Sequence, residues 1–192
     1  MADKGMTILE AALGKGIYIP HLCHHRELEP VGACRLCQVE IAGKWTKTVI
    51  SCKTEVRDGM VVRTETPEIN KMRQIALELL IADHDTDCLA CAQNTKCALQ
   101  RVADHVGINK ERLQRLKPRG EKLPIDDSNP FFNFDPNRCV LCGICVRTCD
   151  ELQNIQAIDY AYRGLETKIA GFGDRLRIES NCESCGECIV RC

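Results

Sequence analysis

Fifteen cysteines are the residues of this 192-residue chain whose type and spacing could support chemistry. Eight of them form two copies of one pattern, in which two CxxC steps are followed, after three residues, by a fourth cysteine. The copies are Cys139, Cys142, Cys145 and Cys149, then Cys182, Cys185, Cys188 and Cys192. Successive CxxC steps can aim three thiolates at three corners of an iron-sulfur cubane. The fourth cysteine cannot reach the same cluster, and we expect it on the first turn of a helix.

Structural zinc and disulfide bonds are two other uses of closely spaced cysteines. Zinc sites usually pair two separated CxxC knuckles, whereas each run here places three thiolates close together, which favours iron-sulfur clusters. Disulfides are disfavoured because the start of the chain has no basic segment followed by an apolar one, so we expect a cytoplasmic protein with reduced thiols. Gly143 and Gly186 follow the second cysteine of each run, as a tight ligand loop requires.

The repeated pattern resembles that of bacterial-type ferredoxins with two [4Fe-4S] clusters, in which the fourth cysteine of each run binds the other cluster. The resemblance implies two crossed ligand sets. These are Cys139, Cys142, Cys145 and Cys192 for one [4Fe-4S] cluster, and Cys149, Cys182, Cys185 and Cys188 for the other. The intervening segment DELQNIQAIDYAYRGLETKI is similar to the alpha subunits of NAD(P)-linked formate dehydrogenases. Gly171 and Gly173 predict only a turn, because a dinucleotide-binding loop needs a third glycine and a preceding strand.

A second group of cysteines lies near the start of the chain, with the spacing Cys23-x10-Cys34-x2-Cys37-x14-Cys52. Together with the segments GIYIPHLCHH, GACRLCQVEIAG and DGMVVRT, this spacing resembles the [2Fe-2S] domain of one family. That domain begins the large iron-sulfur subunit of complex I, [FeFe]-hydrogenases and some formate dehydrogenases. The resemblance implies that these four cysteines bind one [2Fe-2S] cluster.

Two features of this region need a separate interpretation. Only the six residues MADKGM precede the TILEAA segment, so we expect the family's N-terminal β-hairpin to be missing. His21, His24 and His25 crowd the first cysteine of the group. We expect them to line the cluster as loop residues, because four cysteines already fill the site.

The third ligand group combines one histidine with three cysteines, in the pattern His84-x3-Cys88-x2-Cys91-x5-Cys97. By itself this set suits zinc as well as iron. Because it follows the [2Fe-2S] pattern directly, the segment DHDTDCLACAQNTKCALQ resembles the His(Cys)3 [4Fe-4S] domain of the same family. The resemblance implies a third [4Fe-4S] cluster. Four, three, four and four cysteines then use all 15, and the histidine explains the odd number.

Short elements must position these ligands. Thr7 and Glu10 form a capping box, which predicts a short helix that ends at Gly14 or Gly16. The apolar face of this helix should hold Ile8, Ala11, Ala12 and Leu13. The pattern then changes to strands: residues 38–41 and the segment from Trp45 to residue 50 predict a hairpin, and residues 60–64 predict a last strand.

A longer helical pattern begins at Thr66, the predicted N-cap, and delivers His84 at its end. Its predicted apolar stripe is Ile69, Met72, Ile75, Ala76, Leu79 and Leu80. A further helix after Cys97 should use Leu99, Val102, Ala103 and Val106 for packing. Residues 117–137 hold four prolines and predict a connecting segment, of which residues 125–135 should pack on the last module.

The expected fold class is therefore α+β, with three small domains. Residues 1–66 should form a β-grasp, ferredoxin-like [2Fe-2S] domain, residues 67–120 a small helical His(Cys)3 domain, and residues 121–192 a 2[4Fe-4S] ferredoxin domain. Aromatic residues are only 4% of the chain, so small cores stapled by metal clusters are expected. The formal charge of −1 argues against a nucleic-acid partner, and no apolar run is long enough to span a membrane.

These features predict an electron-transfer subunit that carries one [2Fe-2S] and three [4Fe-4S] clusters and has no catalytic residues of its own. The resemblance implies three partners: a flavin-containing NAD(P)H dehydrogenase subunit, its small [2Fe-2S] companion and a catalytic oxidoreductase subunit. One alternative is the detached front of a formate dehydrogenase or [FeFe]-hydrogenase chain, since no molybdopterin or [FeFe] domain follows Cys192 here. A second alternative is a zinc-binding scaffold without a redox role.

Overall fold

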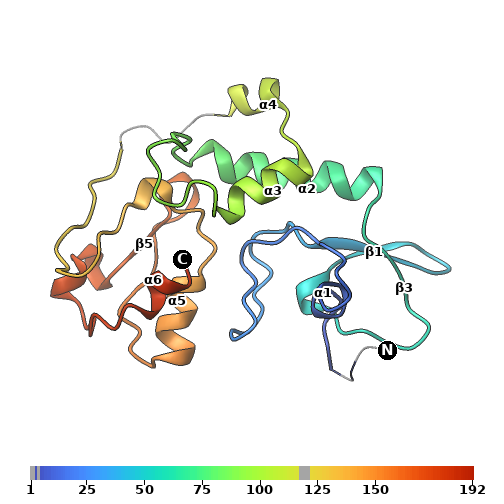
Figure 1. Cartoon of the computed structure of the whole chain (residues 1–192), viewed down its shortest axis with the longest axis horizontal. Helices are drawn as coiled ribbons and strands as arrows, with labels where there is room; N and C mark the ends of the chain where they lie inside the picture. The colour runs from blue at the N-terminus through green and yellow to red at the C-terminus, as the bar shows by residue number, and fades with distance from the viewer. Residues whose placement is uncertain (1–2, 4, 117–121) are drawn as a thin grey trace. The chain divides into compact units, whose positions relative to one another are not determined.

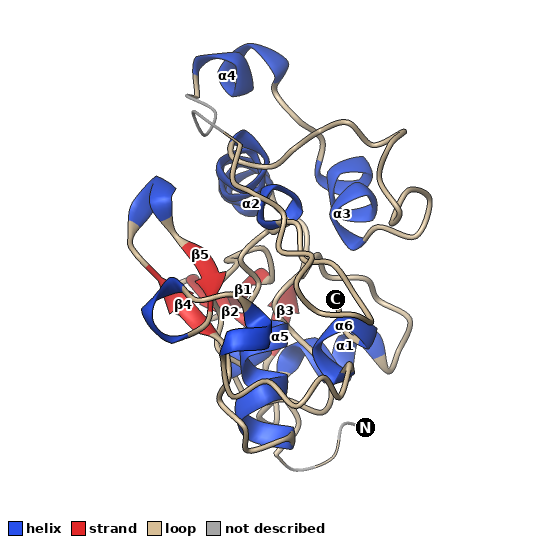
Figure 2. Cartoon of the chain, turned by 90° about the vertical axis from the view of Figure 1, so that its left-hand side faces the viewer, coloured by secondary structure: helices blue, strands red, loops and turns tan. Residues whose placement is uncertain are grey.

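The computed structural model describes residue 3, residues 5–116 and residues 122–192. Helices and short strands both occur along the chain, which makes this a mixed α/β protein (Figures 1 and 2). The chain divides into two compact units. Unit 1 comprises Met1–His24, Pro30–Leu80 and Asp87–Leu116, and unit 2 comprises His25–Glu29, Ile81–Thr86 and Lys117–Cys192. The predicted boundary between residues 120 and 121 lies outside the described residues.

A three-stranded antiparallel sheet organises unit 1. The central strand β1 (Gln38–Ala42) pairs with β2 (Lys47–Ile50) on one side and with β3 (Val61–Arg63) on the other. Both the predicted hairpin and the predicted last strand are confirmed. Trp45 lies outside β2 and is 82% exposed, so the second strand begins later than the sequence suggested. A short 3-10 turn, Ser51–Lys53, follows β2.

Helix α1 (Ile8–Leu13) packs on this sheet, and its predicted capping box is confirmed (Figure 1). The Thr7 hydroxyl accepts from the Glu10 amide at 3.2 Å, and the Glu10 carboxylate accepts from the Thr7 amide at 2.8 Å. The buried core combines residues from the helix, the sheet and the cysteine loops: Ile8, Leu9, Ile19, Cys37, Val39 and Cys52. The predicted apolar face is wrong at Leu13, which is 36% exposed, whereas Ile8 and Ala12 of the same face do pack in the core.

Helix α2 (Pro67–Ala82) begins at the predicted N-cap, where the Thr66 hydroxyl accepts from the Ile69 amide at 3.3 Å. The predicted apolar stripe is correct at Ile69 but wrong at three other members, Met72, Ile75 and Leu79, which are exposed. Beside Ile69, the buried face carries Arg73, Leu77 and Glu78. Two charged side chains can occupy this face because each finds hydrogen-bond and ion-pair partners on other elements, and hydrophobic periodicity does not report such partners.

Two shorter helices complete unit 1. Helix α3 (Ala98–Val106) buries two of its predicted apolar residues, Leu99 and Val102. Helix α4 (Lys110–Arg115) is held by Glu78, whose carboxylate accepts from the Asn109 amide at 2.7 Å and pairs with the Arg112 guanidinium. The buried carboxylate on α2 therefore has a structural role.

Unit 2 consists of short elements around two cysteine loops. Helix α5 (Ile144–Arg147) lies beside α6 (Glu187–Val190) (Figures 1 and 2). An antiparallel ribbon of β4 (Asp159–Ala161) and β5 (Lys168–Ala170) forms between the two cysteine runs, in a segment for which no strand was predicted. The remaining elements are the 3-10 turns Pro136–Arg138, Gly164–Glu166, Phe172–Asp174 and Arg177–Glu179.

The fourth cysteine of each run does not lie on the first turn of a helix, so that prediction is wrong. Cys149 lies in a π-helical turn, Thr148–Leu152, that continues directly from α5, and Cys192 follows the end of α6. The helices start earlier than expected because the left-handed glycines, Gly143 and Gly186, act as their N-caps.

Residues 125–135 pack on unit 2, as predicted. Asp126 and Phe134 form an isolated antiparallel bridge, and the Asp126 carboxylate accepts from the Arg177 amide at 3.0 Å. The Asn129 side chain donates to the Ser184 hydroxyl at 2.7 Å. This segment is therefore tied to the residues that precede and enter the second cysteine loop. Residues 117–121 of the predicted connecting segment lie outside the described residues.

Candidate iron-sulfur sites

Four buried cysteines come together in unit 1. Cys23, Cys37 and Cys52 are each 1% exposed, and Cys34 is 7% exposed. The Cys34 amide donates to the Cys23 sulfur at 3.5 Å. The hydrogen bond from Cys52 lowers the pKa of Cys37 to about 7, whereas the hydrogen bond with Cys23 and burial raise the pKa of Cys34. The structure thus groups the predicted [2Fe-2S] residues in the buried interior of unit 1, where one thiol has a lowered pKa.

The loop between Cys34 and Cys37 is held from behind by Arg73 of α2. The guanidinium donates to the Leu36 carbonyl at 3.1 Å and to the Gln38 carbonyl at 2.8 Å. It therefore hydrogen-bonds the backbone on both sides of Cys37. Arg73 is fully buried and pairs with Glu65 at 2.9 Å. The helix that follows the [2Fe-2S] region therefore fixes the shape of its ligand loop.

The imidazole rings of the histidines near Cys23 contact neighbouring loop residues. The His21 Nδ1 atom lies 2.7 Å from the Ile19 carbonyl oxygen, and the His21 and His24 rings meet edge to face with centroids 5.7 Å apart. His25 belongs to unit 2, where its Nδ1 accepts from the Glu27 amide at 3.3 Å. Their expected role as loop residues remains a prediction.

The two cysteine runs of unit 2 share one local backbone geometry. Leu141 and Ser184, the residues before the second cysteine of each run, both have positive φ, at 53° and 57°. Gly143 and Gly186, the residues after it, also have positive φ, at 69° and 77°. Positive φ values on both sides of the second cysteine curve the backbone into a concave loop. Loops of this kind direct backbone N–H groups at a bound anion.

Cys145 lies among thiols from both runs. Burial raises its pKa, and the nearby thiols of Cys139, Cys142 and Cys192 raise it further. The fourth cysteine of the second run therefore lies within electrostatic reach of the first run.

The other four cysteines share a cavity. Cys149, Cys182, Cys185 and Cys188 all line it. Burial raises the pKa of Cys188, and the thiols of Cys182, Cys185 and Cys149 act in the same direction. The fourth cysteine of the first run is thus grouped with the second run.

Backbone amides already point at two of these sulfurs. The Leu141 amide donates to the Cys139 sulfur at 3.3 Å, and the Ala157 amide donates to the Cys149 sulfur at 3.3 Å. Hydrogen bonds of this kind stabilise a thiolate and shift the reduction potential of a bound cluster.

Tyr160 of β4 covers the first cysteine loop. Its hydroxyl donates to the Leu141 carbonyl at 3.3 Å, and a Cβ atom at Gly143 would overlap this hydroxyl. Burial, together with the thiols of Cys142 and Cys145, raises the pKa of Tyr160 to about 12. The tyrosine therefore stays neutral at physiological pH and shields the loop.

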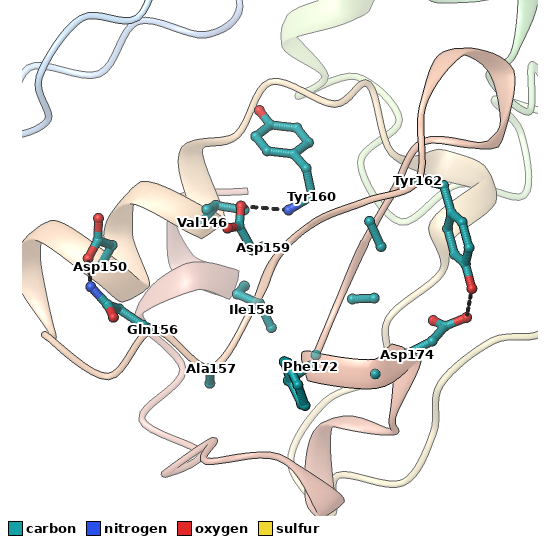
Figure 3. Close-up of a pocket in the computed structure, with 14 residues that line it drawn as sticks. Val146, Asp150, Gln156, Ala157, Ile158, Asp159, Tyr160, Tyr162, Phe172 and Asp174 are labelled. Carbon is teal, nitrogen blue, oxygen red and sulfur yellow. Dashed lines mark hydrogen bonds between the residues drawn. The ribbon is translucent and has the colours of Figure 1, made fainter.

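The ribbon of β4 and β5 also lines a hollow of about 830 Å³. Figure 3 shows Tyr160, Tyr162 and Phe172 around it, with the Tyr162 hydroxyl directed at Asp174. That hydrogen bond is 3.0 Å long, and Asp174 also pairs with Lys168 at 2.7 Å. Gly171 and Gly173 form a turn in its wall, as predicted.

The third predicted ligand set is divided between the units. His84 belongs to unit 2, while Cys88, Cys91 and Cys97 belong to unit 1, so this set stays a prediction of the sequence. Burial lowers the pKa of His84, which favours the neutral imidazole that metal binding requires. Its buried Nδ1 has no hydrogen-bond partner among the described residues. Both properties fit a histidine ligand.

Two features are absent from the described ranges. No three His, Cys, Asp or Glu side chains there are arranged as the ligands of one metal ion. No helix in the same ranges is long and apolar enough to cross a membrane.

Arg73, Tyr160 and Arg177 border the cysteine sites without having been predicted there. Tyr160 had a usable signal, because residues that favour strands recur at every second position: Ile158, Tyr160 and Tyr162. The two arginines had none, since only the tertiary fold brings them to the thiols.

Comparison with known proteins agrees with this geometry. Residues 1–67 match the family described as a 2Fe-2S iron-sulfur cluster binding domain. Residues 73–112 match the NADH-ubiquinone oxidoreductase-G iron-sulfur binding region. The chain therefore contains a 2Fe-2S domain followed by a 4Fe-4S binding region, in the order that the ligand patterns predicted.

Similar proteins extend the likeness over nearly the whole chain. The G 2 subunit of the NADH-quinone oxidoreductase of Rhizobium meliloti is 36% identical over 99% of this chain. The alpha subunit of the NADPH-Fe(3+) oxidoreductase of Geobacter sulfurreducens is 37% identical over 98% of it. The chain spans 22% of the length of each of these relatives.

A solved structure is also similar. One chain of an NAD+-reducing [NiFe]-hydrogenase, crystallised in the H2-reduced state, matches with a TM-score of 0.80 and 34% identity. The match covers 92% of the present chain and 74% of the hydrogenase chain.

Proposed function

This chain belongs to the iron-sulfur subunit family that includes the G subunits of NADH-quinone oxidoreductases, and we propose that it relays electrons between partner subunits. The relay would use one [2Fe-2S] and three [4Fe-4S] clusters, each of which supplies one-electron redox chemistry when bound. The chain itself contributes ligands, burial and hydrogen bonds. It would hold the clusters in three domains, residues 1–66, 67–120 and 121–192.

The observation that carries the proposal is the grouping of the cysteines. Four buried thiols of unit 1 interact electrostatically with one another, and eight thiols of unit 2 fall into two groups of four that exchange their fourth members. Both groupings agree with the ligand sets that the resemblance implies. They support Cys23, Cys34, Cys37 and Cys52 as [2Fe-2S] ligands, and the two crossed sets as [4Fe-4S] ligands.

The surroundings of the thiols also fit anionic clusters. Amide groups donate to Cys23, Cys139 and Cys149, and a buried guanidinium nitrogen of Arg177 borders one cysteine cavity without a hydrogen-bond partner in the described ranges. Donors without acceptors are costly in a dry interior unless a bound group uses them. A cluster with inorganic sulfides would provide such acceptors. The third ligand set, His84 with Cys88, Cys91 and Cys97, is supported by its sequence pattern and by the lowered pKa of the buried His84 imidazole, which leaves a nitrogen lone pair for iron.

The partners follow from the relatives. An NADH-quinone oxidoreductase and an NADPH-Fe(3+) oxidoreductase each take electrons from a nicotinamide nucleotide, as their names state. We therefore propose a flavin-containing NAD(P)H dehydrogenase subunit with its small [2Fe-2S] companion on one side, and a catalytic oxidoreductase subunit on the other.

The function is tested by following electrons through the purified, anaerobically loaded chain. Dithionite should reduce it, and the reduced protein should pass electrons rapidly to an artificial acceptor such as ferricyanide. The chain alone should not turn over NADH or formate. Steady NADH turnover by the pure chain would contradict a pure relay, and a colourless zinc protein without iron would contradict any redox role.

A further inference from the structure

Thr148 is a polar residue buried at the junction of α5 and the π-helical turn, directly before Cys149, with 0% of its surface exposed. Its backbone amide donates to the carbonyls of Ile144 and Cys145, and its carbonyl accepts from the Gln153 amide at 3.2 Å. Both backbone groups are therefore used within the helical turns. The side-chain hydroxyl is different, because its buried oxygen has no hydrogen-bond partner among the described residues.

A buried threonine in a helix ordinarily has a partner for its hydroxyl, which can donate to a carbonyl three or four positions earlier. At Thr148 those carbonyls belong to Cys145 and Ile144, and they accept from the Thr148 amide instead. A hydroxyl without an acceptor destabilises a dry interior unless a bound group supplies the acceptor. The Thr148 hydroxyl is therefore available to a group bound inside unit 2.

The cavity that Thr148 lines is where such a group would lie. Its wall includes the four cysteines of one proposed ligand set: Cys149, Cys182, Cys185 and Cys188. Arg177 lines the same cavity, and its buried Nε also lacks a hydrogen-bond partner in the described ranges. Apolar side chains such as Phe132, Ile155 and Ile158 form most of the remaining wall and cannot accept a hydrogen bond. Two buried donors and four thiols thus border one cavity.

We propose that the Thr148 hydroxyl donates a hydrogen bond to a sulfur atom at the [4Fe-4S] cluster of this set and thereby raises the reduction potential of that cluster. The inference rests on the proposed function, because it takes the cluster as bound. A hydrogen bond to sulfur is stronger when the cluster carries more negative charge, so it stabilises the reduced state more than the oxidised state. It would add to the bond that the Ala157 amide already donates to the Cys149 sulfur at 3.3 Å.

The test compares variants of the full chain that are loaded anaerobically and titrated potentiometrically with detection by EPR. Thr148→Val keeps the branched shape and removes the hydroxyl, while Thr148→Ser keeps the hydroxyl. Thr167→Val is the matched control, because the Thr167 hydroxyl donates to the Gly164 carbonyl at 2.8 Å and does not line the cavity. Cys182→Ala identifies the midpoint of this cluster as the one whose signal is lost or converted. Iron and sulfide are measured in every sample.

Thr148→Val should lower that one midpoint potential by about tenfold in the reduction equilibrium, which is about 59 mV for one electron. The other three midpoints should stay at wild-type values, as should all four in Thr167→Val. Thr148→Ser should stay close to wild type, because it restores the donor. An unchanged midpoint in fully loaded Thr148→Val would overturn the inference. A shift of a different cluster, or an equal shift in Thr148→Ser, would overturn it as well.

The valine variant could also fail to load this cluster. Loading of Thr148→Ser with a wild-type midpoint would then support the need for the hydroxyl, whereas failure of both variants would assign Thr148 to packing and overturn the inference. Failure of the proposed function itself has a different signature. In that case the wild-type chain lacks the iron and the EPR signals altogether.

Discussion

The thiol of Cys192 acts electrostatically on the thiol of Cys145, although 47 positions separate the two residues in the chain. Cys149 in turn shares a cavity with Cys182, Cys185 and Cys188. The last residue of the sequence is therefore tied back to the first cysteine run. Under the proposed ligand sets, neither loop can form its cluster without the other.

The crossing predicts the outcome of Cys192→Ala. This variant should damage the cluster of the first run, for example to a three-iron form, because it removes the fourth ligand there. The cluster held by the second run with Cys149 should be better preserved. The measurement is EPR together with iron analysis, compared with Cys139→Ala and Cys182→Ala. A Cys192→Ala spectrum that matches Cys182→Ala would show that each run binds its own cluster.

Gly143 and Gly186 allow a matched test of the ligand loops. Both have left-handed φ, at 69° and 77°, so alanine is strained at either position. Only at Gly143 would a Cβ also overlap the Tyr160 hydroxyl, whereas nothing lies within 4 Å of a Cβ at Gly186. Gly143→Ala should therefore cost about 1–3 kcal/mol more than Gly186→Ala in denaturant unfolding of the loaded protein. Adding Tyr160→Ala to each variant should remove most of that difference, because it removes the overlapping hydroxyl. Equal losses of unfolding free energy in Gly143→Ala and Gly186→Ala would contradict the account.

The sequence predicted those parts of the fold that depend on local rules. The capping box at Thr7 and the N-cap at Thr66 both depend on residues three positions apart, and both are confirmed. The hairpin around residues 42–44 and the glycine conformations at Gly143 and Gly186 follow from turn chemistry alone. The order of the cysteine patterns agreed with the matched iron-sulfur families.

The features that the sequence did not predict depend on distant partners. Arg73 and Glu78 are buried on α2 because Leu36, Gln38 and Arg112 supply partners from other elements. An apolar stripe with helical spacing therefore pointed to the wrong face. Arg177 is another such case, because Phe134 and Asp126 hold it from a segment more than 40 positions earlier.

Arg73 should be needed for the stability of the [2Fe-2S] loop. Arg73→Met leaves the Leu36 and Gln38 carbonyls without their buried donor, which should cost about 2–4 kcal/mol. Visible circular dichroism of the [2Fe-2S] chromophore during denaturant unfolding measures the effect. Lys71→Met, on the exposed side of the same helix, is the control and should change stability little. An equal loss of stability in Arg73→Met and Lys71→Met would show that Arg73 does not stabilise the [2Fe-2S] loop.

His84 should raise the potential of its cluster. A neutral imidazole in place of a thiolate makes a cluster less negative by one charge, and histidine ligation raises the potential in the Rieske case. His84→Cys should therefore lower one [4Fe-4S] midpoint while four irons stay bound at that site. His105→Cys changes a histidine outside the proposed ligand sets and should leave every midpoint unchanged. An unaltered redox titration of His84→Cys, with intact loading, would show that His84 is not a ligand.

Metal content is the most direct measure of the proposed relay. Iron, inorganic sulfide and zinc should be determined per chain in protein prepared without oxygen. The four ligand sets predict a brown protein with about 14 iron atoms, two from the [2Fe-2S] cluster and twelve from the three [4Fe-4S] clusters, with matching sulfide. Saturation at about 10 iron atoms would remove the His84 cluster, and a colourless protein that holds zinc without sulfide would contradict the electron-transfer function altogether.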